Sequence, residues 1–420
     1  MSETADNELS CVQTLSMSSG KPFISSSISY ETMEETLDIR PGGDSLMIGI
    51  PREEAFQENR IALSPEAAAV LASNGHRVVV EHRAGEGAQY TDKDYSEAGA
   101  RIAYDKKEVF ECGMIIKSAP VSDVELDLLQ YNQMIISPIH LPVMRQHILE
   151  RMMERRITAL SFENLKDDSG HNPIVRSMSE LAGSAVMLIA AQYLGDTRQG
   201  RGVLLGGISG IPPTKVIIIG AGIVGEYAAR TALAVGASVK VFDNNIYRLK
   251  RLQNNMGTRL WTSVIEPGIL AKQLKTCDVA VGALSSAGGR TPIVVTEEMV
   301  SRMRRGSVIV DVSIDRGGCF ETSEVTSHEH PVIMKFGVQH YCVPNIPSRF
   351  ARTASQAISN VLMPLLLEIG DSGGLEHLVW HKFNIRSGIY LFKGALTNVH
   401  LSERFGLKYT DLNLLIASQR

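Results

Sequence analysis

The residues best placed to do chemistry form a glycine-rich stretch that follows an apolar run. Val216–Ile219 has the composition of a buried parallel strand, and the chain then continues as Gly220-Ala-Gly222-Ile-Val-Gly225. In such a turn the first glycine permits the sharp bend, the second lets the backbone approach a pyrophosphate, and the third lets the next helix pack close to the sheet. The stretch therefore predicts a dinucleotide-binding turn.

The elements after this turn strengthen the prediction. A helix is expected over 223–235, and the N–H groups of its first residues, Ile223 and Val224, suit phosphates because a helix N-terminus carries a partial positive charge. A second apolar run, Ser238–Phe242, ends at Asp243. That carboxylate can accept hydrogen bonds from the adenosine ribose of NAD and would repel the extra phosphate of NADP. The alternative is a glycine-rich packing turn in an α/β sheet, but the complete pattern favours NAD.

A histidine lies where a parallel sheet places its active site. His140 follows the expected strand Met134–Ser137, and open α/β folds bind ligands at the carboxyl ends of their strands. Imidazole has a pKa near neutrality and is suited to general acid–base catalysis. The alternative is a histidine that caps the next helix or is satisfied within a loop.

An aspartate occupies a similar position later in the chain. Asp315 lies four residues beyond the expected strand end at Asp311 and is followed by Gly317 and Gly318. The alternative is an aspartate that opens the glycine-rich loop through hydrogen bonds to the nearby backbone. Asp311 is expected to have a structural role.

One arginine is a candidate for binding a carboxylate. Arg60 follows the polar residues Gln57–Asn59, and a guanidinium can hold a carboxylate through two parallel hydrogen bonds. From the residues alone the alternative is favoured, namely a surface arginine paired to Glu58 or Glu53.

The bulk composition narrows the class of protein. The 420 residues are 44% hydrophobic and 21% charged with a net charge of -4, so two domains are expected and neither nucleic acid nor an anionic membrane is indicated as a partner. Five scattered cysteines without a C-x-x-C pair favour a reducing, cytoplasmic compartment. The His, Cys and Asp residues show no metal-ligand spacing, so no metal is predicted.

Neither of two candidate segments has the pattern of a membrane span or a targeting signal. The most apolar stretch, Ser179–Leu194, is shorter than a bilayer span and contains polar residues. The first 45 residues lack a basic region followed by an apolar one, so they do not resemble a signal peptide. They are expected to form a partly ordered extension in which Lys21–Ile28 could be a short strand.

The rest of the chain alternates strands and helices, which is typical of parallel sheets covered on both faces. Four divisions are predicted: an extension (1–45), a first α/β domain (46–174), a dinucleotide-binding domain with its connector helix (175–349), and a return to the first domain (350–420). The helix N-capped by Ser64 is expected over Pro65–Asn74, and 200–213 is expected to be a loop. The other expected strands are Leu46–Ile50, Arg77–Glu81, Gly113–Ile116, Met134–Ser137, Ile157–Leu160, Asp278–Gly282, Ser307–Asp311 and Pro331–Met334, and the other expected helices are Met178–Gln192 and Ala354–Ile369.

From residue 46 to its end, the chain resembles the alanine dehydrogenase family, which shares its architecture with the transhydrogenase α subunit and, more distantly, with saccharopine dehydrogenase. The similar segments occur in the family's order and cover roughly nine-tenths of the chain. They are Ile48–Glu53, Glu58–Pro65, Ala84–Gly87, Met178–Gly183, Gly202–Gly207, Val310–Glu321, Cys342–Pro347 and Gly394–Leu396.

The resemblance implies a fold, an activity and roles for individual residues. The expected fold is α/β, with a flavodoxin-like substrate domain and a Rossmann NAD domain, both doubly wound, joined by long helices. The expected activity is reversible, NAD-dependent oxidative deamination of L-alanine to pyruvate and ammonia by a homo-oligomer, a dimer or a hexamer. His140 and Asp315 would be catalytic, and Arg60 and Lys117 would bind substrate. The cofactor would contact Ser179, Ser285 and Asn345 as well as Gly220, Gly222, Ile223, Val224, Gly225 and Asp243. For Met178 and Ser179, the alternative is a core methionine beside a helix N-cap.

The sequence departs from the family in its substrate site. The family carries a second lysine in a Lys-x-Lys-Glu-Pro turn, whereas this chain has Lys117-Ser-Ala-Pro120 and so retains only the first. Phe162 replaces an aromatic residue that commonly bears a hydroxyl. The substrate could therefore be another amino acid or a secondary amine, and a catalytically impaired NAD-binding regulator is a further alternative. A transhydrogenase subunit is less favoured, because the Val310–Glu321 segment has the dehydrogenase form.

Overall fold

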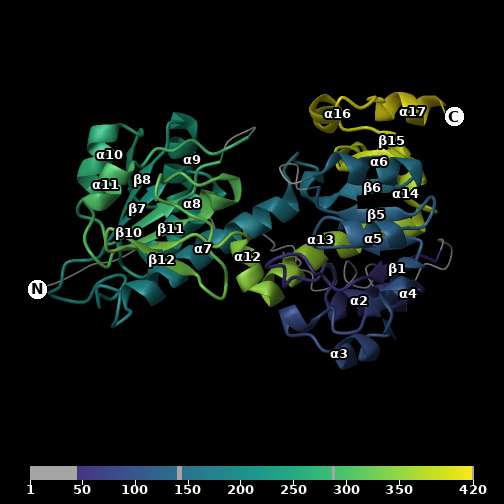
Figure 1. Ribbon diagram of the computed structural model, residues 1–420, viewed down its shortest axis with the longest axis horizontal. Coiled ribbons are helices and arrows are strands. Elements are labelled where there is room, and N and C mark those ends of the chain that lie inside the picture. The colour runs from purple at the N-terminus through teal and green to yellow at the C-terminus, as the bar shows by residue number, and fades with distance from the viewer. Residues whose placement is uncertain (1–44, 140–143, 286–288, 419–420) are drawn as a thin grey trace, which may run out of the picture. The chain divides into compact units, whose positions relative to one another are not determined.

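The structure is a computed structural model that describes residues 45–139, 144–285 and 289–418. These residues form two α/β lobes, each built on its own sheet (Figure 1). The expected strand at Lys21–Ile28 lies outside the described residues. The predicted division of the chain into four parts remains a prediction.

The first lobe contains an eight-stranded sheet in the order β15-β14-β6-β5-β4-β1-β2-β3. Its strands are β1 (Met47–Ile50), β2 (Arg77–Glu81), β3 (Arg101–Ala103), β4 (Met114–Ile116), β5 (Met134–Ser137), β6 (Thr158–Ser161), β14 (Ile389–Phe392) and β15 (Ala395–Leu396). Its helices are α2 (Pro65–Ser73), α3 (Asp92–Glu97), α4 (Lys106–Phe110), α5 (Asp123–Leu128), α6 (Gln146–Glu154), α13 (Ala351–Asp371), α14 (Leu375–His381), α15 (Phe383–Arg386), α16 (Val399–Phe405) and α17 (Leu412–Ser418), with short 3-10 turns η1 (Glu86–Ala88) and η2 (Phe162–Asn164).

The strand order of this sheet agrees with the predicted fold class. Strands β1 to β6 pair in parallel, and β14 is antiparallel to both β6 and β15. With the short edge strand β3 set aside, the parallel part has the flavodoxin-like order 2-1-3-4-5. The sequence prediction missed β3 and the β14–β15 hairpin.

The second lobe contains a seven-stranded sheet in the order β12-β13-β11-β10-β7-β8-β9. Apart from the antiparallel edge strand β12, this is the Rossmann order 3-2-1-4-5-6. Its strands are β7 (Lys215–Ile219), β8 (Ser238–Phe242), β9 (Trp261–Ser263), β10 (Val279–Gly282), β11 (Val308–Asp311), β12 (Val332–Lys335) and β13 (Val338–Tyr341). Its helices are α7 (Pro173–Leu194), α8 (Ile223–Ala234), α9 (Ile246–Met256), α10 (Pro267–Leu274), α11 (Glu297–Ser301) and α12 (Ile346–Arg349), and η3 (Val312–Arg316) is a 3-10 turn.

Side-chain alternation along the strands gives each sheet two apolar faces. In β7, Val216 and Ile218 belong to one core cluster, while Ile217 and Ile219 belong to another on the opposite face. The predicted N-cap of α2 is confirmed, because the Ser64 hydroxyl accepts a hydrogen bond from the backbone N–H of Ala67.

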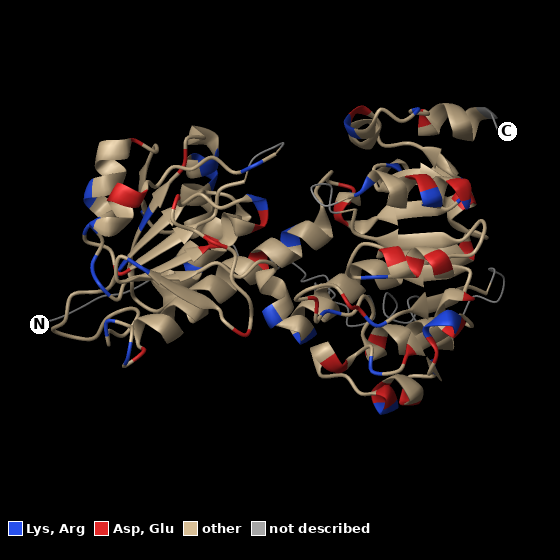
Figure 2. Ribbon diagram, viewed as in Figure 1, with Lys and Arg blue, Asp and Glu red and all other residues tan. Residues whose placement is uncertain are grey.

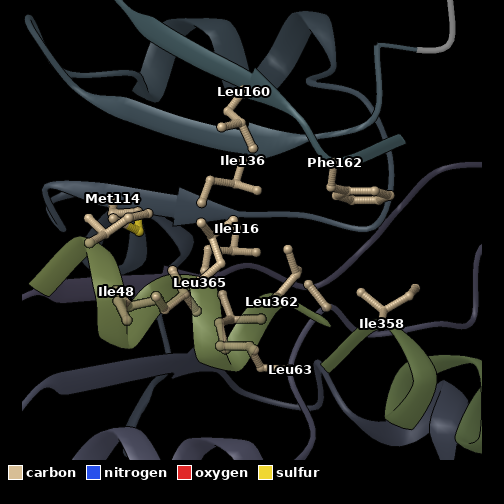
Figure 3. Close-up of a cluster of buried hydrophobic side chains, with 14 of the residues drawn as sticks. Ile48, Leu63, Met114, Ile116, Ile136, Leu160, Phe162, Ile358, Leu362 and Leu365 are labelled. Carbon is tan, nitrogen blue, oxygen red and sulfur yellow. The ribbon is translucent and has the colours of Figure 1, made fainter. Parts of the chain in front are cut away.

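Helix α13 follows the second lobe in sequence and packs against the first sheet. Figure 3 shows Ile358, Leu362 and Leu365 of this helix against side chains of the first sheet, among them Ile116 and Ile136. All five are buried. This apolar contact places side chains of α13 in the core of the lobe whose strands lie mostly before residue 162.

Among the described helices, only α7 is long and apolar enough to span a membrane by length and composition. In this structure it packs in the core of the second lobe, where Val186 and Ile189 are buried. A Cβ added at Gly183 would lie 2.4 Å from the carbonyl oxygen of Val224, so α7 and α8 make close backbone contact. The glycine is therefore required by packing.

Candidate active site

A cavity of about 480 Å³ lies where segments that follow the strands of both sheets meet. This agrees with the rule that open α/β sheets bind ligands beyond the carboxyl ends of their strands. It is lined in the first lobe by Ala55, Phe56, Gln57, Glu58, Arg60, Ser118, Ala119, Pro120, Pro138, Phe162 and Glu163, in α7 by Ile174, Val175, Met178, Ser179 and Ala182, and in the second lobe by Val224, Val312, Asp315, Pro344, Asn345, Ile346 and Pro347.

The glycine-rich turn has the geometry that a pyrophosphate requires. Gly220 has a φ of 118°, and a Cβ there would lie 2.3 Å from the carbonyl oxygen of Ala283. A Cβ at Gly225 would lie 1.9 Å from the carbonyl oxygen of Gly220, whereas a Cβ at Gly222 would meet no atom within 4 Å. Two glycines are thus sterically required, and the third leaves open space at the N-terminus of α8.

Asp243 is connected to the same turn. Its carboxylate is only 4% exposed and accepts hydrogen bonds from the backbone N–H groups of Ala221 and Asn245, each at 2.7 Å. Arg251, which is not among the residues predicted from the sequence, donates to the carbonyl oxygen of Ala221 at 3.1 Å. The carboxylate oxygens retain lone pairs for ribose hydroxyls, so these residues fit an adenosine dinucleotide.

A hydrogen-bonded series of side chains joins the two lobes at the cavity. The guanidinium of Arg60 donates from Nε and Nη2 to the two carboxylate oxygens of Glu58. The side-chain amide of Asn345 also donates to Glu58, at 3.1 Å, and its backbone N–H donates to Asp315 Oδ1 at 3.0 Å. Asn345 has a φ of 55°, in the left-handed region that asparagine tolerates better than most residues. Two separate candidates from the sequence, Arg60 and Asp315, are therefore brought together.

Arg60 has features of both interpretations made from the sequence, the ion-paired arginine and the carboxylate-binding arginine. The arginine is ion-paired as the structural alternative supposed, but its side chain is 13% exposed and lines the cavity. Burial by itself lowers the pKa of Arg60, and the carboxylates of Glu58, Glu53 and Asp315 more than offset it, so that the pKa is raised. Glu58 occupies Nε and one hydrogen of Nη2. The edge formed by Nη1 and Nη2 therefore retains two parallel donors for a substrate carboxylate.

Lys117 does not meet the expectation of a substrate ligand in this structure. Its side chain is 1% exposed, and its ammonium lies 2.7 Å from carboxylate oxygens of both Glu53 and Glu125. Glu53 also accepts hydrogen bonds from the backbone N–H groups of Ser118 and Ala119. Burial alone would lower the pKa of Lys117, but the two carboxylates raise it. The lysine fixes the turn after β4, and the cavity lining does not include it.

This assignment predicts a large loss of stability in Lys117→Met. The variant leaves Glu53 and Glu125 buried without their cation, which is expected to lower the free energy of unfolding by about 3 kcal/mol. Urea denaturation followed by circular dichroism measures the change. Lys93, exposed and paired with Glu97, provides a control, because Lys93→Met should change stability by less than about 0.5 kcal/mol. Equal stability of Lys117→Met and the wild type would contradict the structural role.

Of the remaining predicted site residues, some line the cavity and others do not. His140 lies outside the described residues, but Pro138, two residues earlier, lines the cavity. Ser179 and Met178 also line it, and Ser179 lies inside α7 rather than at its N-cap, with its hydroxyl donating to the carbonyl oxygen of Val175. Ser285 is exposed and does not line the cavity.

Two acidic residues support the candidates structurally, and of these Glu125 is absent from the sequence predictions. Glu125 forms a capping box with Ser122, and this Ser-x-x-Glu signal was available in the sequence. Asp311 is fully buried and accepts hydrogen bonds from the backbone N–H groups of Ser313 and Cys319, which agrees with its expected structural role. Within the described residues, no cluster of three or more His, Cys, Asp or Glu side chains is arranged to hold a metal.

Comparisons with known proteins agree with this geometry. The alanine dehydrogenase/PNT N-terminal domain matches residues 49–182, and the corresponding C-terminal domain matches residues 185–399. Alanine dehydrogenase 2 of Staphylococcus aureus is 35% identical over 368 residues, which are 87% of this chain and 98% of that protein. A solved L-alanine dehydrogenase superimposes with a TM-score of 0.79 at 35% identity and covers 86% of this chain and 99% of its own.

A more distant structure shares the fold. The transhydrogenase from Sinorhizobium meliloti superimposes with a TM-score of 0.71 at 24% identity, over 84% of this chain and 99% of its own. The family matches cover both lobes, and the match to the Staphylococcus aureus protein extends over nearly its whole length. The chain therefore belongs to the alanine dehydrogenase/PNT family.

Proposed function

We propose that this protein is an NAD-dependent alanine dehydrogenase that converts L-alanine, NAD and water to pyruvate, ammonium, NADH and a proton, and catalyses the reverse reaction. The observation that supports it most is the hydrogen-bonded series from Arg60 through Glu58 and Asn345 to Asp315. It joins a carboxylate-binding edge to a carboxylate that can order water, in the cavity that Val224 of the dinucleotide-binding helix also lines.

The proposed chemistry divides among the residues as follows. Bound NAD would accept a hydride from the α-carbon of the amino acid. Arg60 holds the substrate carboxylate through its Nη1–Nη2 edge. His140 takes the proton from the α-ammonium and releases it to solvent, since a group with a near-neutral pKa can both accept and donate protons. It then takes a proton from the water that adds to the imine and passes this proton to the amino group. Asp315, fixed by Asn345, orders this water, and the carbonyl forms as the amino group leaves with the hydroxyl proton as ammonium.

Steady-state assays in both directions test this function. L-Alanine with NAD should produce NADH, and pyruvate with NADH should yield NAD only when ammonium is present. Absence of NADH formation from L-alanine, combined with absence of ammonium-dependent NADH oxidation, would remove the proposal.

The preference for NAD over NADP is proposed to depend on Asp243. The extra phosphate of NADP would lie against this buried carboxylate, and two like charges repel strongly where water is excluded. Asp243→Asn should lower the ratio of kcat/KM for NAD to that for NADP by about tenfold or more, equivalent to about 1.4 kcal/mol. An unchanged ratio would place cofactor selection elsewhere.

Dehydrogenation of a different amine is the second candidate. The specific observation is that Lys117 is bound between Glu53 and Glu125, which leaves Arg60 as the one basic side chain among the described lining residues. The chemistry would stay the same while the substrate changed.

We further propose a cytoplasmic homo-oligomer, a dimer or a hexamer, with no nucleic-acid or membrane partner. Exposed apolar side chains gather on α7 and the segment that follows it, including Leu188, Leu204, Ile208 and Ile211. Leu188 and Leu204 line an apolar groove there, and apolar surface of this kind commonly marks an interface. Light scattering coupled to gel filtration gives the number of copies.

The four described cysteines are free and buried, as suits a reducing compartment.

A further inference from the structure

The segment that carries Arg60 is irregular, and the hydrogen bonds of its backbone N–H groups can be followed one by one. Residues 58–61 belong to no strand or helix. The N–H of Glu58 donates to the carbonyl oxygen of Ala55, and the N–H of Arg60 donates to Oε1 of Glu58. The N–H groups of Asn59 and Ile61, which flank Arg60, donate to side chains of other elements. Since backbone donors shielded from water need a partner, these side chains help to decide where the chain holds Arg60.

Two serines of neighbouring helices supply these partners. Ser348 Oγ, in α12, accepts a hydrogen bond from the N–H of Asn59 at 2.8 Å, and Ser355 Oγ, in α13, accepts one from the N–H of Ile61 at 2.9 Å. Ser348 is 1% exposed and Ser355 is fully buried, so both hydroxyls are shielded from water. The residues before and after Arg60 are thus each fixed to a helix.

Further contacts restrict the same segment. The side-chain amide of Asn345 donates to Glu58 at 3.1 Å, and the N–H of Ser348 donates to the carbonyl oxygen of Asn345 at 2.9 Å. One short turn of chain therefore holds both Glu58 and Asn59. A Cβ added at Gly87 would lie 2.6 Å from the carbonyl oxygen of Asn59, so the segment has no room to shift toward Gly87.

The contact between this segment and α13 is otherwise apolar. Leu63 belongs to the same buried cluster as Ile358 and Leu362 of α13, and Figure 3 shows the three side chains. Residues 353–367 of α13 contain no Asp, Glu, Lys or Arg and are drawn tan in Figure 2. The acceptor that α13 offers to the segment is therefore a neutral hydroxyl, which pairs with an N–H group without competing as a carboxylate would for the guanidinium of Arg60.

We propose that Ser348 and Ser355 are positioning residues for Arg60. They hold the main chain on both sides of the arginine, so that its Nη1–Nη2 edge meets the substrate carboxylate in a fixed geometry. The inference rests on the proposed dehydrogenase function and adds to its substrate site two residues that do not line the cavity. A displacement of about 1 Å in a substrate-positioning group can reduce the rate about 10²-fold, so the loss of either hydroxyl acts on the substrate.

Single substitutions, assayed with pyruvate, ammonium and NADH, test the proposal. Ser348→Ala and Ser355→Ala should each raise KM for pyruvate about tenfold. KM for NADH should stay within about twofold of the wild type, because the glycine-rich turn is a separate part of the chain. A KM for pyruvate within about twofold of the wild type in either variant would remove that serine from the proposal. Absence of turnover by the wild-type protein would instead refute the proposed function.

A second serine of α13 provides a matched control. Ser359 Oγ lies about one helical turn beyond Ser355 and accepts a hydrogen bond at 2.7 Å from the N–H of Ser64, the N-cap of α2. Ser359→Ala removes the same group from a site that is 1% exposed. It should lower the midpoint of urea denaturation about as much as Ser355→Ala does, and should leave KM for pyruvate unchanged. If Ser359→Ala raised KM for pyruvate as much as Ser355→Ala, the effect would be general destabilisation and the positioning role would be contradicted.

A milder substitution keeps the test decisive if Ser348→Ala or Ser355→Ala does not fold. Ser348→Cys and Ser355→Cys retain most of the side-chain volume but replace the hydroxyl by a weaker acceptor, so KM for pyruvate should rise about threefold. Far-UV circular dichroism verifies the fold of each variant. A folded cysteine variant with the KM of the wild type would then overturn the role of that serine.

Discussion

His140→Ala is expected to lower kcat for the oxidation of L-alanine by about 10²-fold to 10⁴-fold, the usual contribution of a general acid–base group. The proposed reaction removes a proton from the α-ammonium before hydride transfer and another from water afterwards. The described lining residues supply no other side chain with an ordinary pKa near neutrality. Stopped-flow measurement of NADH formation separates the chemical step from product release.

A second histidine of the first lobe serves as the control. His147 lies on α6 and pairs with Asp123 on the surface, so His147→Ala should leave kcat within about twofold, as expected of a surface substitution remote from the chemistry. The rate with His140 present should also fall as the pH drops below the pKa of the imidazole, because the base is then protonated. Full activity of His140→Ala would exclude this residue from the chemistry.

Arg60→Ala is the second large effect, expected to lower kcat/KM for L-alanine by about 10²-fold to 10³-fold. The variant removes the two donors that face the substrate carboxylate. It also leaves Glu58 buried and charged, and truncating one partner of a buried charge pair costs about 3–5 kcal/mol of folding stability. The loss of kcat/KM should appear mainly in KM if the contact forms in the ground state.

The double variant Arg60→Ala with Glu58→Gln separates the two contributions. It removes the uncompensated carboxylate and should recover stability, as measured by urea denaturation, without recovering kcat/KM. Arg60→Lys keeps the charge but loses the bidentate edge and should remain at least tenfold below the wild type. Wild-type kcat/KM in Arg60→Ala would show that the carboxylate binds elsewhere.

The dinucleotide turn could be predicted because its requirements are local. Gly225 must be glycine since any Cβ would collide with the carbonyl oxygen of Gly220, five residues earlier. Asp243 likewise follows directly from the end of β8, and its hydrogen bonds reach back to the same turn. Patterns contained within one βαβ unit can be recognised in sequence for this reason.

The ion pairs of Lys117 could not be predicted from a local pattern. Its position beside a family motif suggested a substrate ligand, but its role is decided by Glu53, which is 64 residues away in sequence. The contact between Asn345 and Asp315 likewise depends on β11 and β13 being neighbours in the sheet. Contacts that tertiary structure creates between distant residues leave no local pattern.

The β14–β15 hairpin was not predicted for a different reason, which lies in its turn residues. Its turn residues, Lys393 and Gly394, both have positive φ values of 49° and 82°, the conformation of a tight two-residue hairpin turn. Lysine seldom occupies such a position, so the usual Asn-Gly or Asp-Gly signal was absent. The strand pairs were consequently overlooked, although Tyr390 and Phe392 are buried within them.

Transfer of deuterium from the α-carbon of an amino acid to the cofactor is the most direct test of the proposed dehydrogenation. L-Alanine deuterated at the α-carbon is incubated with the protein and NAD, and the isolated NADH is examined by mass spectrometry and NMR. The cavity and the dinucleotide turn predict that one deuterium appears at the reactive carbon of the nicotinamide ring, and that none appears with His140→Ala over the same period. NADH that contains only hydrogen, or deuterium released into water instead, would contradict hydride transfer from the α-carbon.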